Sequence, residues 1–212
     1  MDNVTHAIAG VLAAEAVVQL RRGLGGAPTP AWGRAAWIVS ALAHNLADAD
    51  VVYAGITGGA LGYLLHHRGH THTLALSPLL ALLAYGPAAW WARRRRLGFT
   101  RRDHVWLGAL ALAGPVGHVA LDLSNDYGVH PLWPVSNAWL YGDAVFIVEP
   151  LFWACTIPVV AAATRWRPGR WLWGAVLAAG LVLAWVVDLV PRGGAVASTA
   201  LAVASIAVAW RA

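Results

Sequence analysis

The sequence predicts an all-α membrane protein, a polytopic transmembrane bundle of about seven helices, with five to seven as the range. The chain of 212 residues is 59% hydrophobic and only 12% charged, and its mean hydropathy is +0.58. A soluble domain normally carries about 25% charged residues. Several segments also exceed the roughly 18 apolar residues that mark a transmembrane helix. We therefore expect a single membrane-embedded domain over residues 1–212.

Seven apolar segments account for the expected helices, and Arg-, Gly- and Pro-rich connections separate them. The segments are 4–20, 35–55, 72–92, 104–123, 143–163, 171–190 and 194–210. Every motif described below falls within 1–155, whereas 156–212 contributes C-terminal transmembrane segments without a motif. We therefore expect a motif-bearing core over 1–155 followed by further membrane helices.

The first segment begins after Asp2 and Asn3, either of which can cap a helix. Arg21 and Arg22 follow its apolar run, which is the reverse of a signal peptide, so we expect this helix to be retained. Polar residues interrupt the second segment, 35–55.

The third segment follows Thr71, which is placed to cap it. Arg93–Arg96 end the third segment, Arg101 and Arg102 precede the fourth, and Arg165–Arg170 separates the fifth from the sixth.

The arginines predict the orientation of the bundle. All 15 basic residues are arginine, and alternating loops place 13 of them on one side, leaving only Arg68 and Arg192 on the other. Positively charged loops face the cytoplasm. The N-terminus is therefore expected outside and the C-terminus inside, in the inner (plasma) membrane. This asymmetry also explains the pI of about 10.1, so no nucleic-acid partner is expected.

The same topology gathers histidines and carboxylates on the outer side. The histidines expected there are His6, His44, His66, His67, His70, His72, His118 and His130, and the acids are Asp48, Asp50, Asp122, Asp126, Asp143 and Glu149. At a rise of about 1.5 Å per residue, groups from several helices reach a similar depth. Because an isolated charge in a membrane helix costs about 2.5–3.5 kcal/mol, mutual pairing around an ion is expected.

Two segments carry a histidine and an aspartate at i and i+4, which places both on one helix face. His118 and Asp122 form one pair, and His44 and Asp48 form the other, with Asp50 completing an Asp-x-Asp motif. Such carboxylates suit a divalent ion or orient a ligating imidazole. The alternatives are a helix-stabilising hydrogen bond for the first pair and a frayed, solvated helix end for the second.

The densest cluster is His66-His67-Arg68-Gly69-His70-Thr71-His72. Imidazoles suit zinc and similar transition metals, and we expect His67 and His72 to be ligands, with His66 and His70 supporting or facing solvent. Arg68 can hold an anionic oxygen of a substrate. The alternative is an exposed histidine-rich loop without function. His6 is likewise either a packing residue or, given its depth, a ligand.

As a set, these motifs resemble a family of membrane-bound metal-dependent hydrolases of bacteria and archaea, one member of which is described as a LexA-binding inner-membrane protein. The resemblance rests on the motifs Met1–His6, Asp48–Asp50, His67–His72, His118–Asp122, Asn125–Gly128, Trp133–Ser136 and Phe146–Pro150. More remotely, the family is similar to the zinc-dependent phospholipase C and nuclease superfamily. This chain departs from the pattern at Ala47, His44, His70 and Glu149.

The resemblance implies a metal centre of one or more ions, zinc or another divalent transition metal. The implied ligands are His6, Asp48, His67, His72, His118 and Asp122, with His44, His70 and Glu149 as further candidates. It leaves open which of His44, His66, His70 and His130 bind metal directly.

The expected function is metal-assisted hydrolysis at the extracytoplasmic face, on a phosphoester of a membrane lipid or lipid-linked substrate. Metal ions activate water for such attack, Asp50 or Asp122 can accept its proton, and Arg68 can neutralise a phosphoryl oxygen. The alternative is a divalent metal-binding or metal-transport protein, although the inner halves of the helices offer few polar groups beyond Glu15. A haem protein is less consistent, since carboxylates accompany every histidine cluster.

Overall fold

The computed structural model describes residues 1–52, 56, 67–187 and 190–211. Regular structure in these residues is helical, apart from an isolated antiparallel bridge between Val129 and Leu140. The chain divides into two compact units, Met1–Ile147 and Val148–Ala212. The predicted all-helical class is confirmed.

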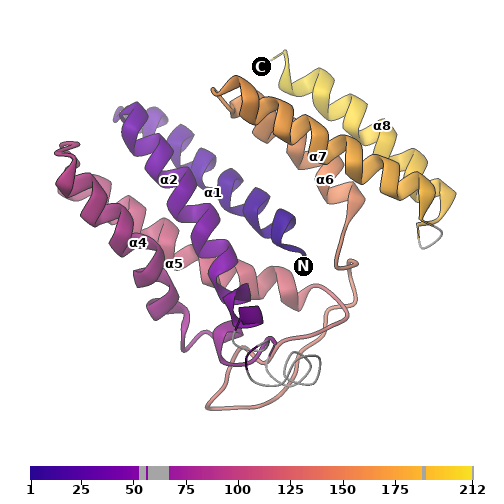
Figure 1. Cartoon of the computed structure of the whole chain (residues 1–212), viewed down its shortest axis with the longest axis horizontal. Helices are drawn as coiled ribbons and strands as arrows, with labels where there is room; N and C mark the ends of the chain where they lie inside the picture. The colour runs from indigo at the N-terminus through magenta and orange to yellow at the C-terminus, as the bar shows by residue number, and fades with distance from the viewer. Residues whose placement is uncertain (53–55, 57–66, 188–189, 212) are drawn as a thin grey trace. The chain divides into compact units, whose positions relative to one another are not determined.

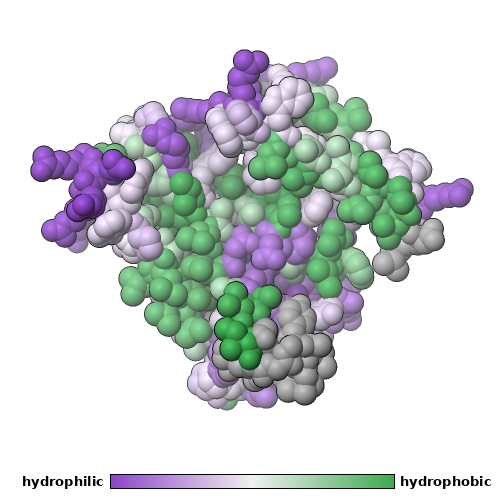
Figure 2. Space-filling model, in the orientation of Figure 1, coloured by the Kyte–Doolittle hydropathy of each residue, from purple (hydrophilic) through white to green (hydrophobic). Residues whose placement is uncertain are grey.

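Among its described residues, the first unit has four α-helices and two short 3₁₀ helices, and the α-helices are labelled in Figure 1. They are α1 (Asn3–Gly23), α2 (Pro30–Asn45), η1 (Leu46–Ala49), η2 (His70–His72), α4 (Ser77–Arg94) and α5 (Arg101–Leu123). The helices α1 and α5 are long and apolar enough to cross a membrane. In Figure 2 hydrophobic side chains cover much of the helices, while hydrophilic side chains project at the end of the first unit where α4 ends in Figure 1.

Local sequence signals explain where these helices begin. The Asp2 side chain accepts a hydrogen bond from the Thr5 backbone N–H at 2.9 Å and so caps α1. At α5, Thr100 and Asp103 form a reciprocal capping box. Arginines in the last turns of α1 and α4 face the negative end of each helix dipole, which is favourable.

The structure departs from the predicted elements beside the histidine cluster. The second segment leaves the α-helix at Asn45 and continues as η1, where the Asn45 side chain donates to the Ala41 carbonyl at 2.8 Å. The third segment becomes α-helical only at Ser77, with a proline in its first turn. The prediction that Thr71 caps the helix of the third segment is wrong. The Thr71 hydroxyl instead donates to the Asp50 carboxylate at 2.9 Å, and α4 begins six residues later, at Ser77.

Small residues let α2 pack closely against its neighbours (Figure 1). A Cβ on Gly10 of α1 would lie 2.7 Å from the Ala41 Cα, and a Cβ on Gly114 of α5 would lie 2.3 Å from the Ala43 Cβ. Close backbone approach through small residues is typical of membrane helices. Around these contacts Trp32 and Leu107 form part of a fully buried apolar core.

The second unit contains three mutually contacting helices, α6 (Pro150–Ala163), α7 (Arg167–Val186) and α8 (Arg192–Ala209). Both α7 and α8 are long and apolar enough to cross a membrane, whereas α6 is shorter. A Cβ on Gly180 would lie 2.6 Å from the Trp153 ring, so α6 and α7 also pack closely.

Candidate metal centre

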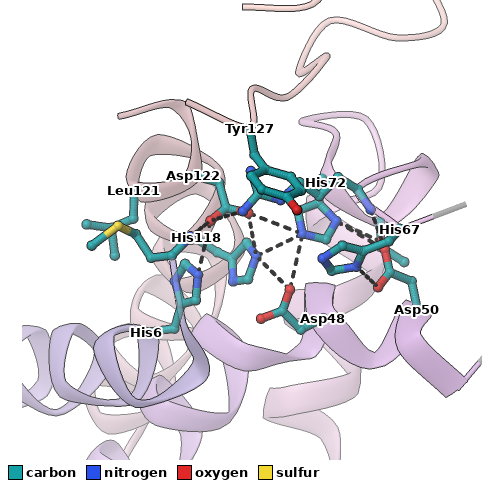
Figure 3. A network of polar contacts seen from close by, with 12 residues as sticks. His6, Asp48, Asp50, His67, His72, His118, Leu121, Asp122 and Tyr127 are labelled. Carbon is teal, nitrogen blue, oxygen red and sulfur yellow. Dashed lines mark hydrogen bonds and ion pairs between the residues drawn. The ribbon is translucent and has the colours of Figure 1, made fainter. Parts of the chain in front are cut away.

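The ends of several elements bring histidine and aspartate side chains together in the first unit. His6 lies in the first turn of α1, and His118 and Asp122 lie near the end of α5. Asp48 belongs to η1, and His72 belongs to η2. Figure 3 shows these five side chains converging on one point.

Four of these residues form a compact, mostly buried ligand group. Asp48, His72, His118 and Asp122 each present a ligand atom within 4.8 Å of the others. The Nε2 atoms of His72 and His118 are 3.1 Å apart, and both lie 3.4 Å from the Asp122 Oδ2. His72, His118 and Asp122 have no exposed surface. The arrangement is that of a candidate divalent metal site.

A second ligand group adjoins the first. It consists of Asp48, Asp50 and His67, again with ligand atoms within 4.8 Å of one another. The His67 Nδ1 lies 3.0 Å from the Asp50 Oδ1. Asp48 belongs to both groups, so its carboxylate lies where it can be shared between two ions.

Buried atoms without hydrogen bonds show that the residues fit a metal ion. Neither ring nitrogen of His6 has a hydrogen-bond partner, and the same holds for the Asp122 Oδ2. The His6 ring stacks on His118 at 3.7 Å between centroids, and its Nε2 lies 3.3 Å from the Asp122 Oδ1 without forming a hydrogen bond. Orphaned buried polar groups are costly, and a bound cation offers them a partner. Imidazole and carboxylate ligands suit zinc and similar divalent ions.

The carboxylates favour a positive charge at this place. The His72 ring lies 3.3 Å from the Asp48 Oδ1 and 3.4 Å from both the Asp50 Oδ2 and the Asp122 Oδ2. A metal ion bound here would take neutral His72 as a ligand, since a ligating imidazole must be unprotonated at the nitrogen that binds.

A backbone contact fixes the orientation of His118. Its Nδ1 donates to the carbonyl oxygen of His44 at 2.6 Å, and its Nε2 is directed into the ligand group. Ligating histidines commonly donate their second ring N–H to a carbonyl in this way. The contact between α5 and the end of α2 thus prepares His118 for metal binding.

The Asp50 carboxylate organises the loop that carries His67 and His72. Its Oδ2 accepts hydrogen bonds from the Arg68 backbone N–H and the Thr71 hydroxyl, both at 2.9 Å. Its Oδ1 contacts His67, as described above. Asp50 therefore positions two candidate ligands while belonging to the second group itself.

Arg68 links the centre to the segment that follows α5. Its guanidinium donates to the Asn125 Oδ1 at 3.0 Å and to the Gly128 carbonyl at 3.2 Å. The same group lies 3.4 Å from the Asp122 Oδ1 and 5.0 Å from the centroid of the Tyr127 ring. Arg68 is buried, with 4% of its surface exposed.

The other candidate histidines lie apart from the two ligand groups. His44 is buried, and its Nδ1 contacts the Ser40 carbonyl at 2.8 Å. His70 is exposed and packs edge-on against Trp133. His130 contacts the Asn137 side chain at 2.7 Å. His66 lies outside the described residues.

Glu149 belongs to the second unit, where its side chain accepts a hydrogen bond from the Leu151 N–H and caps α6. Its expected contribution to the metal site stays a prediction.

Comparison with known proteins identifies the family of this chain. The family model described as "YdjM inner membrane protein" matches residues 1–209. The chain belongs to the YdjM inner membrane protein family. It is also 27% identical over 169 residues to "Uncharacterized protein YfhP" of Bacillus subtilis (strain 168), an alignment that covers 80% of this chain and 47% of that protein. The chain thus spans about half the length of this relative. No solved structure matches.

Membership of the YdjM inner membrane protein family agrees with the four helices among the described residues that are long and apolar enough to cross a membrane. Both findings fit the predicted membrane location, and the buried Asp and His residues can bind a metal ion, as predicted. The predicted orientation of the bundle and the remote similarity to zinc-dependent phospholipases C stay predictions.

Two asparagines at the centre were not recognised as site residues from the sequence. Asn125 is fully buried and accepts a hydrogen bond from Arg68, and Asn3 donates to the Asp48 Oδ2 at 2.9 Å. Both lie within the sequence motifs that carry the family resemblance. That position in the motifs was the available signal, because an isolated asparagine has no characteristic spacing.

Proposed function

We propose that this member of the YdjM family is a membrane-embedded, metal-dependent hydrolase that cleaves a phosphoester of a lipid or lipid-linked substrate at the extracytoplasmic face. The observation that carries the proposal is the pair of adjoining ligand groups that share Asp48. Sites with two metal ions a few ångströms apart are typical of enzymes that hydrolyse phosphoesters.

The contacts of these residues indicate which metal ion each of them would hold. His72, His118, Asp48 and Asp122 would hold one ion, and Asp48, Asp50 and His67 would hold a second. When bound, such ions supply Lewis-acid polarisation of a phosphoryl oxygen and make a water molecule more acidic. The buried position of the first group limits competing water and strengthens electrostatic interactions.

Asp50 and Asp122 are the two carboxylates expected to accept a proton, and their surroundings differ. Both oxygens of Asp50 contact donors from the loop that it holds in place. The Oδ2 of Asp122 has no hydrogen-bond partner. Either carboxylate could accept the proton from a water molecule, and Asp50 also positions His67 and His72.

A lipid or lipid-linked substrate is favoured by the segment between α5 and α6. Here Val135, Tyr141 and Phe146 expose more than half of their surface. The start of the same segment reaches the centre through the hydrogen bond between Asn125 and Arg68. Aromatic side chains of this kind are enriched where a protein meets the membrane–water interface. A substrate that lies in the outer leaflet would be close to the centre.

The alternative of metal transport finds less support. A transport path needs polar groups that continue through the membrane. On the far side of the centre, the described core of the first unit is apolar, with Val39, Leu107 and Ala111 fully buried. Glu15 is engaged by Trp37 and Gln19.

The proposal is tested with purified protein in detergent, loaded with Zn²⁺, on a phosphodiester such as p-nitrophenyl phosphorylcholine and on a p-nitrophenyl acyl ester. We expect cleavage of the phosphodiester, loss of activity with a chelator and recovery when the metal is restored. His118→Ala should be inactive, whereas His104→Ala, at the other end of α5, should retain activity. Equal activity of the two variants, or cleavage of the acyl ester alone, would refute the proposal.

A further inference from the structure

A pocket lies at the other end of the first unit from the candidate metal centre. The C-terminal turn of α4, the loop after it and the start of α5 line this partly open pocket of about 440 Å³. Its lining includes Arg93, Arg96, His104, Trp90 and Phe99. Along α5, 14 residues lie from His104 in the pocket to His118 in the candidate metal centre, a distance of about 21 Å. The pocket is therefore a site distinct from the proposed catalytic one.

The pocket is lined for an anion. It presents two guanidinium groups, Arg93 and Arg96, and no carboxylate among its described lining residues. The nearest acid in the sequence, Asp103, is engaged elsewhere, with Arg21 at 2.6 Å and with the hydroxyl and backbone N–H of Thr100 at 2.8 Å each. The positive charge of the pocket is therefore not neutralised by its own walls.

His104 adds a hydrogen-bond donor. Its Nδ1 lies 3.0 Å from the Tyr85 hydroxyl, and the imidazole lines the pocket. When the tyrosine donates to Nδ1, the proton of the neutral ring is on Nε2, which can then donate to a ligand oxygen. Two arginines and one imidazole N–H together suit a phosphate group.

The surroundings of the pocket are those of a membrane surface. Trp90 exposes 64% of its surface, and the guanidinium carbon of Arg94 lies 6.0 Å from its ring centroid. Further along α4, Leu82 and Leu83 are also exposed. Tryptophan and arginine at a helix end above an apolar helix face are typical of the headgroup region. A molecule with a phosphate at one end and acyl chains at the other would place the phosphate at the arginines and the acyl chains along the apolar face.

We propose that the pocket between α4 and α5 binds the phosphate headgroup of an anionic phospholipid, whose acyl chains lie along the exposed apolar face of α4. Basic pockets between transmembrane helices are known to hold anionic headgroups. The bound lipid would connect the two helices, and α5 is the helix that carries His118 and Asp122. The proposal does not depend on the hydrolase function.

The test is native mass spectrometry of the full-length protein, delipidated in detergent and titrated with phosphatidylglycerol or with phosphatidylcholine of the same chains. We expect phosphatidylglycerol to bind preferentially. The double variant Arg93→Gln/Arg96→Gln should weaken that binding by roughly 10- to 30-fold. The matched control is Arg101→Gln/Arg102→Gln, which removes the same charge from neighbouring residues that do not line the pocket. It should change the affinity by less than about twofold.

Two further measurements distinguish binding of a lipid from binding of a free phosphate, and a loss of lipid binding from a loss of folding. Glycerol 1-phosphate without acyl chains should not displace the lipid, and displacement at equal concentration would show a site for a free anion. Circular dichroism of both double variants checks that they remain folded. If they do not, His104→Ala should still weaken phosphatidylglycerol binding relative to phosphatidylcholine. Equal losses in the two double variants, or equal binding of the two lipids, would overturn the proposal.

Discussion

Arg68 occupies a different environment from the one that its sequence suggested. We expected an arginine free to hold the anionic oxygen of a substrate, but its guanidinium is buried against Asn125, Gly128 and Asp122. The planar fork makes these contacts together, which a lysine ammonium cannot do. The same fork lies 3.4 Å from the Asp122 Oδ1, and its role toward a substrate stays a prediction.

Arg68→Lys should therefore lower the rate of phosphodiester cleavage by about one to two decades, because a charge-assisted, desolvated contact is worth roughly 1.5–3 kcal/mol. The metal content should stay at the wild-type level, since Arg68 is not a ligand. Parallel measurements of turnover and of metal per protein check both parts. If Arg68→Lys turns over substrate as fast as the wild type, Arg68 has only a structural role. If the variant loses metal, Arg68 is needed to keep the ligand groups in place.

Asp48 belongs to both ligand groups, so variants of Asp48 and of a residue in one group alone can test how many metal ions bind. Asp48→Ala should abolish binding of both ions, whereas His67→Ala should remove the second group and leave the buried group with His72 and His118. Elemental analysis should then give two ions for the wild type, one for His67→Ala and none for Asp48→Ala. An identical metal content in the two variants would contradict the assignment of two adjoining groups.

For single residues, much of the candidate site could be predicted from the sequence, since a buried histidine or carboxylate in a membrane helix needs a partner. His6, Asp48, His72, His118 and Asp122 lie together as expected. His44 does not join them. Its i, i+4 relation to Asp48 assumed a continuous α-helix, but α2 ends at Asn45. The 3₁₀ turn changes the angular relation between the two residues, and the His44 ring packs against Gly117 instead.

Among the elements, the contact between α2 and α5 has the most direct effect on the centre. It places the His44 carbonyl against the His118 Nδ1. Gly114 allows this approach, since its Cβ would lie 2.3 Å from the Ala43 Cβ and 2.7 Å from the Ala43 carbonyl carbon. Backbone atoms cannot move aside as a flexible side chain can, so any side chain at this position must separate the helices.

Gly114→Ala should accordingly destabilise the protein by about 1–3 kcal/mol through overpacking and weaken metal binding by displacing His118. The matched control is Gly108→Ala on the same helix, where nothing lies within 4 Å of the added Cβ. That change should be neutral or slightly stabilising, because alanine favours helix. Thermal unfolding followed by circular dichroism compares the two variants, and equal melting temperatures would show that the close contact is not limiting.

Element positions were predicted best where apolar runs end in charged residues. The first and fourth segments agree closely with α1 and α5, because Asp2, Thr100 and the arginines provide local start and stop signals. The boundaries beside η1 and η2 were predicted less well. There the backbone follows tertiary hydrogen bonds, such as Thr71 to Asp50, and no local pattern in the sequence encodes them.

For the whole molecule, composition alone was sufficient to predict the helical membrane class, since so apolar a chain must place most of its surface in lipid. The sequence predicts a motif-bearing core over 1–155 and C-terminal segments over 156–212, and the structure divides into compact units after Ile147. The position of this division follows from contacts between distant residues and not from a change in composition. The orientation in the membrane rests on the arginine asymmetry and is open to a direct test.

Single cysteines at exposed positions should report this orientation, after the native Cys155 is replaced by alanine. Ala138, in the segment after α5, and Gly23, at the end of α1, are both exposed. The positive-inside rule predicts that a membrane-impermeant maleimide labels Ala138→Cys in intact cells and Gly23→Cys only after lysis. The expected outer loop at 57–71 lies largely outside the described residues. The reverse labelling pattern would place the candidate centre on the cytoplasmic side.

The most direct test of the central claim is the metal content of the protein purified without chelators, with His72→Ala and His70→Ala measured in parallel. The two histidines lie in the same short helix, but His72 is buried in the ligand group and His70 is exposed. We predict at least one divalent transition-metal ion per wild-type chain, an unchanged content in His70→Ala and a loss in His72→Ala. A wild-type protein without stoichiometric metal, or equal contents in the two variants, would contradict the account.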